Sequence, residues 1–239
     1  PAWKMAPALI CGNTVVIKPA ALAPSCTFRI AEALVEAGLP KGVLNVVTGS
    51  SREIGDTFVN PPSLRAISFT GSCGVGDHIY SAVAPRKLPA QLEMGGKNPT
   101  IVLKDADLEY AVDTVMNAAF ASTGQKCTAT SRAVVEAGIY DQFVARIVEK
   151  TKALKIGDGM EPGIYMGPCV DESQMKTVLE YIEKGKSDGC KLLAGGNRLE
   201  GPLAKGYFVA PTIFADVAPD ATIAQEEIFG PVLAIIRAN

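Results

Sequence analysis

Short runs of β-branched residues alternate with longer amphipathic stretches along the whole chain of 239 residues. Strand composition is found, for example, in residues 14–17, 132–136 and 207–214, and helical periodicity in residues 25–37, 140–154 and 172–187. This alternation is typical of parallel strands joined by crossover helices. The sequence therefore predicts an α/β fold built on open parallel sheets.

A cluster of turn-forming residues interrupts the alternation at residues 94–99, Met-Gly-Gly-Lys-Asn-Pro. Gly and Pro are the strongest local breakers of helices and strands. We therefore predict a domain boundary here, with one domain in residues 1–94 and a second in residues 95–239.

The charge balance and the apolar pattern exclude several classes of partner. With 23 Lys and Arg residues against 25 Asp and Glu residues and no basic cluster, we expect no nucleic acid partner. No apolar run approaches the roughly 18 residues that span a bilayer, so we expect no membrane partner. The six cysteines form no C-x-x-C pair, which favours reduced thiols and a cytoplasmic location. A single histidine, His78, gives no reason to expect a metal site.

Two residues stand out as candidates for chemistry. Cys127 lies in a polar loop, Thr-Gly-Gln-Lys-Cys-Thr, between a predicted helix and a predicted strand, where α/β folds hold reactive groups. A thiol in such a loop is more accessible than one in an apolar run, although many loop cysteines are inert. Glu93 ends a predicted strand just before two glycines, where a carboxylate could act as a general base or simply lie in water.

Two further segments have the character of ligand-binding turns. Residues 69–72, Phe-Thr-Gly-Ser, close a predicted strand shortly before a helix, and small side chains at such a turn favour phosphate. Thr70, Gly71 and Ser72 are therefore candidates, although the segment is not a G-x-G-x-x-G fingerprint. Lys18 directly follows a predicted strand, at the carboxyl end where open α/β sheets collect ligands.

Five segments, in this order, closely resemble the aldehyde dehydrogenase superfamily. They are residues 12–20 (GNTVVIKPA), 69–72 (FTGS), 92–99 (LEMGGKNP), 124–127 (GQKC) and 226–232 (EEIFGPV). The resemblance covers essentially the whole chain. It implies Rossmann-like parallel sheets, with the C-terminal part of a cofactor-binding domain in residues 1–94 and most of a catalytic α/β domain in residues 95–239.

The resemblance also implies oxidation of an aldehyde to a carboxylic acid with NAD or NADP. The Cys127 thiolate would attack the carbonyl carbon to give a thiohemiacetal, and loss of hydride to the nicotinamide would leave a thioester. Glu93 would then activate the water that hydrolyses the thioester.

Roles in cofactor binding follow from the same resemblance. Lys18 would bind the adenine ribose, and Ser72 with its neighbours Thr70 and Gly71 would bind the pyrophosphate. Glu227 would bind the nicotinamide ribose, and Phe229 would pack near the nicotinamide end.

The sequence departs from the family pattern in two respects. Ala21 stands where many NAD-preferring members carry a glutamate that repels a 2′-phosphate, so we expect NADP to be accepted. Family members are about twice as long, with an oxyanion-stabilising asparagine upstream of Pro1 and a terminal strand used in assembly. We therefore expect this chain to be an excerpt of a longer enzyme that forms a homo-oligomer, and the activity of the excerpt itself stays open.

Two alternatives concern the reaction, and one further resemblance concerns the substrate. A CoA-acylating enzyme would share the cysteine chemistry, but Glu93 argues against it; a truncated, non-catalytic binding module is the other reading. Residues 124–132 are similar to those of dehydrogenases that act on semialdehydes of dicarboxylic acids, such as α-ketoglutaric semialdehyde. Arg132 is a candidate clamp for the distal carboxylate, although a structural salt bridge is the commoner role for such an arginine.

Overall fold

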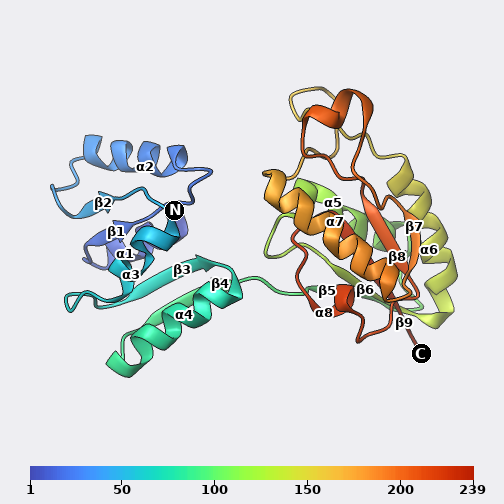
Figure 1. Cartoon of the computed structure of the whole chain (residues 1–239), viewed down its shortest axis with the longest axis horizontal. Coiled ribbons are helices and arrows are strands. Elements are labelled where there is room, and N and C mark those ends of the chain that lie inside the picture. The colour runs from blue at the N-terminus through green and yellow to red at the C-terminus, as the bar shows by residue number, and fades with distance from the viewer. The chain divides into compact units, whose positions relative to one another are not determined.

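The computed structural model describes all residues from 1 to 239. Figure 1 shows the elements along the chain, which divides into two compact units, Pro1–Met94 (unit 1) and Gly95–Asn239 (unit 2). Each unit alternates strands and helices, so the α/β class predicted from the sequence is confirmed.

Unit 1 contains two separate two-stranded sheets. Strand β1 (Val15–Ile17) pairs in parallel with β2 (Leu44–Val46), and β3 (Ile67–Gly71) pairs in parallel with β4 (Ala90–Met94). The helices are α1 (Ala2–Ile10), α2 (Ser25–Glu36), α3 (Ser51–Val59) and α4 (Cys73–Val83), followed by a 3₁₀ helix at Ala84–Arg86. Helices α2 and α4 lie in the crossovers of the two pairs, as parallel pairing requires.

Unit 2 is built on one five-stranded sheet in the order β5-β6-β9-β8-β7. The strands are β5 (Pro99–Val102), β6 (Arg132–Glu136), β7 (Lys191–Ala194), β8 (Thr212–Ala215) and β9 (Val232–Ala238). β9 lies in the middle of the sheet, and residues 232–236 are all buried, as expected for a central strand covered on both faces.

One edge of this sheet differs from the parallel arrangement that we predicted. β7 pairs with β8 in the antiparallel sense, with a register shift between Leu192 and Ala194. The connection between the two strands carries only a 3₁₀ helix, Gly201–Lys205, and no α-helix that could return the chain for a parallel pair. At the opposite edge β5 carries Ile101, which is 68% exposed.

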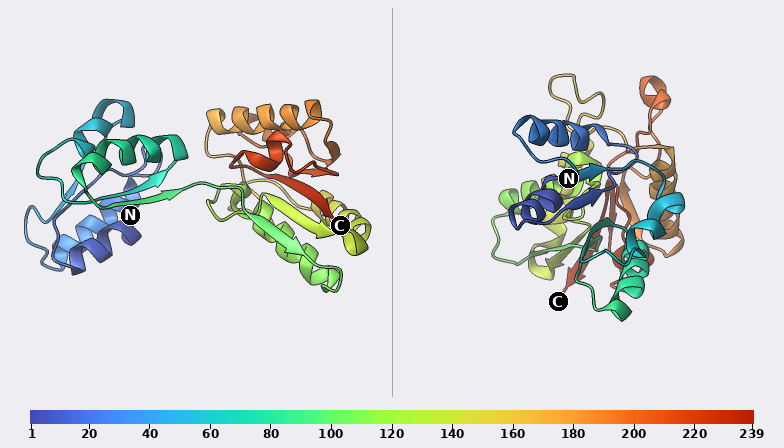
Figure 2. Two further views of the ribbon diagram at one scale, coloured as in Figure 1. Left: turned by 90° about the horizontal axis from the view of Figure 1, so that it is seen from below. Right: turned by 90° about the vertical axis from the view of Figure 1, so that its left-hand side faces the viewer.

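Helices cover both faces of the sheet in unit 2. α5 (Leu108–Phe120) and α6 (Ala137–Lys152) pack on one face, and α7 (Glu172–Ser187) and α8 (Thr222–Gln225) pack on the other (Figure 2). Each face has its own cluster of buried apolar side chains. None of the helices in the chain has both the length and the apolar character needed to cross a bilayer.

Candidate active site

Cys127 is an exposed residue in the loop that leads into β6. The loop begins where α5 ends in a 3₁₀ helix, Ala121–Gly124, in which Ser122 and Thr123 have positive φ angles of 55° and 60°. The chain therefore leaves the axis of α5 abruptly and enters a turn. The structure thus agrees with the loop position that the sequence predicted for this thiol.

Hydrogen bonds from a neighbouring connection hold the first part of this loop. The Thr123 hydroxyl donates to the carbonyl of Gly167 at 3.1 Å, and the Gln125 side-chain oxygen accepts from the Val170 amide at 2.9 Å. Both contacts precede Cys127 in sequence. They hold the residues just before Cys127 against the segment that leads into α7.

Gly124 brings the same loop close to the chain before β9. Its φ angle is 65°, and a β-carbon at this position would overlap the carbonyl oxygen of Gly230. Only glycine combines the left-handed backbone with this close approach. The loop of Cys127 is therefore in contact with residues 226–232, the segment that carries Glu227 and Phe229.

Two side chains of α7 order this second segment. The Gln174 amide donates to the carbonyls of Ile228 and Phe229, both at 3.0 Å, and the Tyr181 hydroxyl donates to the Glu226 carboxylate at 2.8 Å. Phe229 has a φ of 55° and a 38% exposed side chain, so its ring is held out toward solvent.

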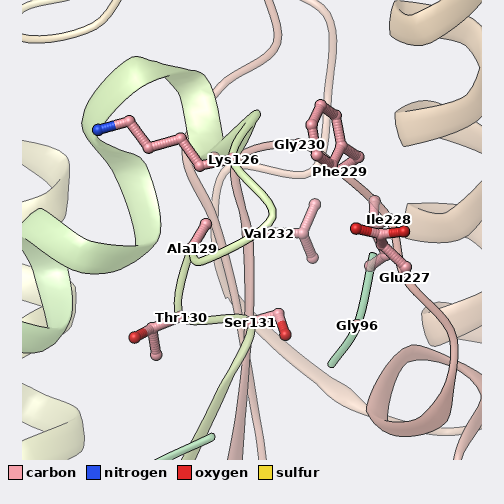
Figure 3. A pocket seen from close by; sticks show the side chains of 11 residues that line it. Gly96, Lys126, Ala129, Thr130, Ser131, Glu227, Ile228, Phe229, Gly230 and Val232 are labelled. Atoms are coloured by element: carbon pink, nitrogen blue, oxygen red, sulfur yellow. The ribbon is translucent and has the colours of Figure 1, made fainter. Parts of the chain in front are cut away.

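The Glu227 carboxylate lies directly against the backbone of Gly95, where any β-carbon would overlap it. A small cavity of about 10 Å³ lies between Glu227 and the cysteine loop. Figure 3 shows Lys126 across this cavity from Glu227, with its ammonium directed away. The cavity is lined by Gly96, Gly124, Lys126, Ala129, Thr130, Ser131, Glu227, Ile228, Phe229, Gly230 and Val232. A volume near 10 Å³ suits about one water molecule, so the cavity is a seam between two segments and not a substrate pocket.

Lys97 is a buried cation that the sequence reasoning missed. Its Nζ atom is inaccessible and has no hydrogen-bond partner. Burial, followed by the nearby positive charge of Arg132, lowers the pKa of Lys97 to about 8, and the carboxylates of Glu227 and Glu226 partly oppose this. The sequence signal available was a lysine inside a Gly-Gly-Lys-Asn turn between two strands, which says nothing about burial.

The Arg132 side chain forms one hydrogen bond within the protein. Its Nε donates to the Lys97 carbonyl at 3.1 Å, and the side chain forms no ion pair with a carboxylate. The salt bridge that we considered is therefore replaced by a hydrogen bond to backbone.

In unit 1 the candidate site residues of β3 and β4 lie on neighbouring, paired strands. Thr70 and Gly71 are the last residues of β3, and Thr70 is directly opposite Glu93 in the register of β4. Ser72 is the N-cap residue of α4, and its side chain makes no capping hydrogen bond. Glu93 is exposed and accepts a hydrogen bond from the Gln91 amide at 3.1 Å.

Lys18 directly follows β1, the strand that pairs with β2 in the other small sheet of unit 1. Its ammonium donates to the neighbouring Pro19 carbonyl at 2.9 Å. Lys18 and Glu93 belong to unit 1, whereas Cys127, Glu227 and Phe229 belong to unit 2, so cooperation between the two sets stays a prediction.

Comparison with known proteins covers the entire chain. Residues 1–239 match the model described as the aldehyde dehydrogenase family. The chain is 50% identical over 240 residues to alpha-ketoglutaric semialdehyde dehydrogenase of Bacillus subtilis, covering 100% of this chain and 49% of that protein. It is 48% identical over 238 residues to 1-pyrroline-5-carboxylate dehydrogenase of a Geobacillus species, covering 97% of this chain and 45% of that protein.

Solved structures agree with this match. A crystal structure of betaine aldehyde dehydrogenase from Staphylococcus aureus in complex with NAD+ superposes with a TM-score of 0.97 at 35% identity, covering 100% of this chain and 48% of that one. The chain thus spans about half the length of the curated relatives it matches.

Proposed function

The chain belongs to the aldehyde dehydrogenase family, and from this premise we propose that it oxidises an aldehyde to a carboxylic acid with NAD+ or NADP+ through Cys127. The observation that carries the proposal is the exposed thiol of Cys127, held in an ordered loop beside Glu227 and Phe229. An exposed thiol at a loop of an α/β domain suits nucleophilic attack, because the sulfur is open to a substrate carbonyl.

In this proposal unit 1 is the C-terminal part of the cofactor-binding domain and unit 2 is the catalytic domain. Ser72 fits a pyrophosphate, because it stands at the N-terminus of the 11-residue helix α4 and its hydroxyl is not used in capping. In unit 2 the carboxylate of Glu227, at the cavity, suits the hydroxyls of a ribose, and the exposed ring of Phe229 suits contact with a planar group. A bound nicotinamide supplies an acceptor for hydride.

The residues of the chain account for the remaining chemistry. The Cys127 sulfur forms a bond to the carbonyl carbon, which becomes tetrahedral and can then release hydride, leaving a thioester on the sulfur. Glu93 takes a proton from water, the resulting hydroxide attacks the thioester, and the carbon–sulfur bond breaks to release the carboxylic acid. The exposure of Glu93 leaves its carboxylate free to approach that water.

We further propose that the substrate is an aldehyde that carries a carboxylate. Two relatives near 50% identity are named for alpha-ketoglutaric semialdehyde and for 1-pyrroline-5-carboxylate. Because Arg132 already donates through Nε to the Lys97 carbonyl, only its terminal nitrogens remain for such a carboxylate.

The cofactor proposal extends to NADP+. Ala21 is exposed and follows Lys18 in the turn after β1, and it carries no charge that would repel a 2′-phosphate. We expect NADP+ to bind with an affinity comparable to that of NAD+, as measured by titration calorimetry. Strong discrimination in favour of NAD+ would overturn this extension.

The test of the function is aldehyde oxidation by the chain and two variants. Cys127→Ser should abolish formation of reduced cofactor, whereas Glu93→Gln should retain a single burst of reduced cofactor and lose turnover. Acceleration of turnover by CoA would support the acyl-transferring alternative instead. Full activity in Cys127→Ser would rule out the proposed nucleophile, and Cys169→Ser, at a buried thiol, serves as the matched control.

A further inference from the structure

The side chain of Asn98 contacts the backbone of the nucleophile loop at two points. Its Nδ2 atom donates to the Cys127 carbonyl at 2.7 Å and to the Ala129 carbonyl at 3.1 Å. Both neighbours are carbonyl oxygens, so the nitrogen of the amide must face them. The two donor hydrogens of one side chain therefore bind the carbonyls on either side of Thr128.

The backbone of Asn98 binds the other end of the same loop. Its carbonyl accepts hydrogen bonds from the Ser131 amide at 3.0 Å and from the Arg132 amide at 3.2 Å. The loop has no helix or strand of its own between Gln125 and Ser131. The half-buried Asn98 therefore holds the loop at two places, at Cys127 and at the start of β6.

We propose that Asn98 is the positioning residue of the nucleophile: its side-chain amide fixes the Cys127 backbone, and through it the sulfur, for attack on the aldehyde. This inference rests on the proposed function of Cys127. Asn98 touches neither substrate nor sulfur in this role and acts through the two carbonyls that it binds.

The reason for this role is geometric. A nucleophile gains rate from being held at the correct distance and angle to the carbonyl carbon, and a displacement of about 1 Å can cost 10²-fold in turnover. The peptide of Cys127 lies in a turn whose internal support is one bond, from the Ala129 amide to the Lys126 carbonyl at 3.0 Å. Loss of the Asn98 amide would leave this turn free to shift while Ser131 and Arg132 stay bound.

Two substitutions separate the amide from the rest of the residue. Asn98→Ala removes both donors, and Asn98→Asp keeps the shape but places a carboxylate against two carbonyl oxygens. Asn197→Asp is the matched control, because Asn197 is an exposed residue of the same unit whose amide also donates to a carbonyl, that of Arg198 at 2.8 Å.

The first measurement is hydrogen exchange of the chain itself, which needs no substrate. We expect the amides of Ala129 and Thr130 to exchange roughly tenfold faster in both Asn98 variants than in the wild type. The amides of Ser131 and Arg132 serve as an internal reference, since their acceptor is the backbone carbonyl of residue 98, which both substitutions keep. Unchanged exchange at Ala129 and Thr130 would overturn the inference, whatever the activity.

The second measurement is the division of the effect between kcat and KM for aldehyde oxidation. We expect kcat to fall by about 10²-fold in Asn98→Asp and less in Asn98→Ala, with KM for aldehyde and for NAD+ within about threefold of wild type. Faster exchange with unchanged kcat would show a merely structural contact and overturn the positioning role, while the proposed function would stand. A wild-type chain that oxidises no aldehyde would contradict the proposed function and with it the catalytic half of this inference.

Discussion

The two units bury their apolar side chains to different extents. In unit 2 both faces of a five-stranded sheet carry extensive clusters of buried residues. In unit 1 the buried cluster contains only Val59, Ile79 and Val83 and packs against the sheet of β3 and β4, while Trp3 and Ile10 are 91% and 87% exposed. Because hydrophobic stabilisation scales with buried apolar area, the folding free energy is concentrated in unit 2. The candidate nucleophile therefore stands on the better-packed unit, and the candidate base stands on the other.

The strongest test of this comparison is a truncation in the core of unit 2. Phe143 of α6 is fully buried against α5, so Phe143→Ala should lower the free energy of unfolding by about 3–5 kcal/mol. Urea unfolding monitored by circular dichroism measures the loss. Tyr110→Ala, at a 75% exposed position of α5, is the control and should change little. A loss below about 1 kcal/mol for Phe143→Ala would contradict the concentration of stability in unit 2.

A second prediction concerns the backbone that supports the nucleophile. Gly124→Ala should cost about 1–3 kcal/mol of stability from the left-handed backbone alone, and more from the overlap with the Gly230 carbonyl. It should also lower aldehyde oxidation, because the loop of Cys127 must move away. Gly163→Ala is the matched control, since Gly163 has a φ of 81° with nothing near its β-carbon position. Equal losses in the two variants would mean that the close approach to Gly230 contributes nothing.

The third prediction is a gain of stability in unit 2. Lys97→Met removes a buried ammonium without a hydrogen-bond partner and should raise the free energy of unfolding by on the order of 1 kcal/mol near neutral pH. The folded pKa, about 8, lies below the ordinary value of 10.5, so the unfolded chain binds this proton more tightly. The wild type should therefore gain stability as pH rises from about 8 to about 10.5, and the advantage of the variant should shrink over that range.

Thermal unfolding at neutral and at alkaline pH measures this difference. Lys126→Met, at an exposed lysine of the same unit, provides the control for loss of a positive charge. A lower melting temperature for Lys97→Met at neutral pH would mean that attraction to Glu226 and Glu227 outweighs the cost of burial.

The smallest effect is expected in unit 1. Trp3 has the largest side chain in the chain, yet it is 91% exposed, so Trp3→Ala should change the free energy of unfolding by no more than about 0.5 kcal/mol. Urea unfolding under the same conditions allows direct comparison with Phe143→Ala. A loss of several kcal/mol would show that unit 1 has a packed core around α1 after all.

Much of the fold was predictable because its signals are local. The predicted strand at residues 132–136 and the predicted helix at 172–187 have the observed bounds, since β-branched residues and a helical period are read directly from the sequence. α1 was missed because Pro7 lies inside it, and proline usually argues against a helix interior. The strand predicted at 207–214 is observed only at Thr212–Ala215. Among the preceding residues, Val209 forms an isolated antiparallel bridge with Arg198 and is not part of β8.

The candidate site was predictable only in part. Cys127 and the turn at Ser72 are visible as residues at the ends of elements. The contact of Asn98 with Cys127 joins residues 29 positions apart, and the buried ammonium of Lys97 lies near Arg132, Glu226 and Glu227, which are more distant still. No local pattern encodes these contacts. From the sequence, Asn98 could be assigned only to the cluster of turn-forming residues at 94–99.

The two edges of the sheet in unit 2 have consequences for handling the protein in the laboratory. At one edge, the register shift in β7 and the lysine that begins this strand, Lys191, discourage a further strand from adding. The opposite edge, β5, is only four residues long and begins with Pro99, which limits pairing, but Ile101 is 68% exposed and offers an apolar contact to another chain. Purification at low protein concentration, with light scattering to follow the onset of turbidity, therefore suits this chain better than early concentration.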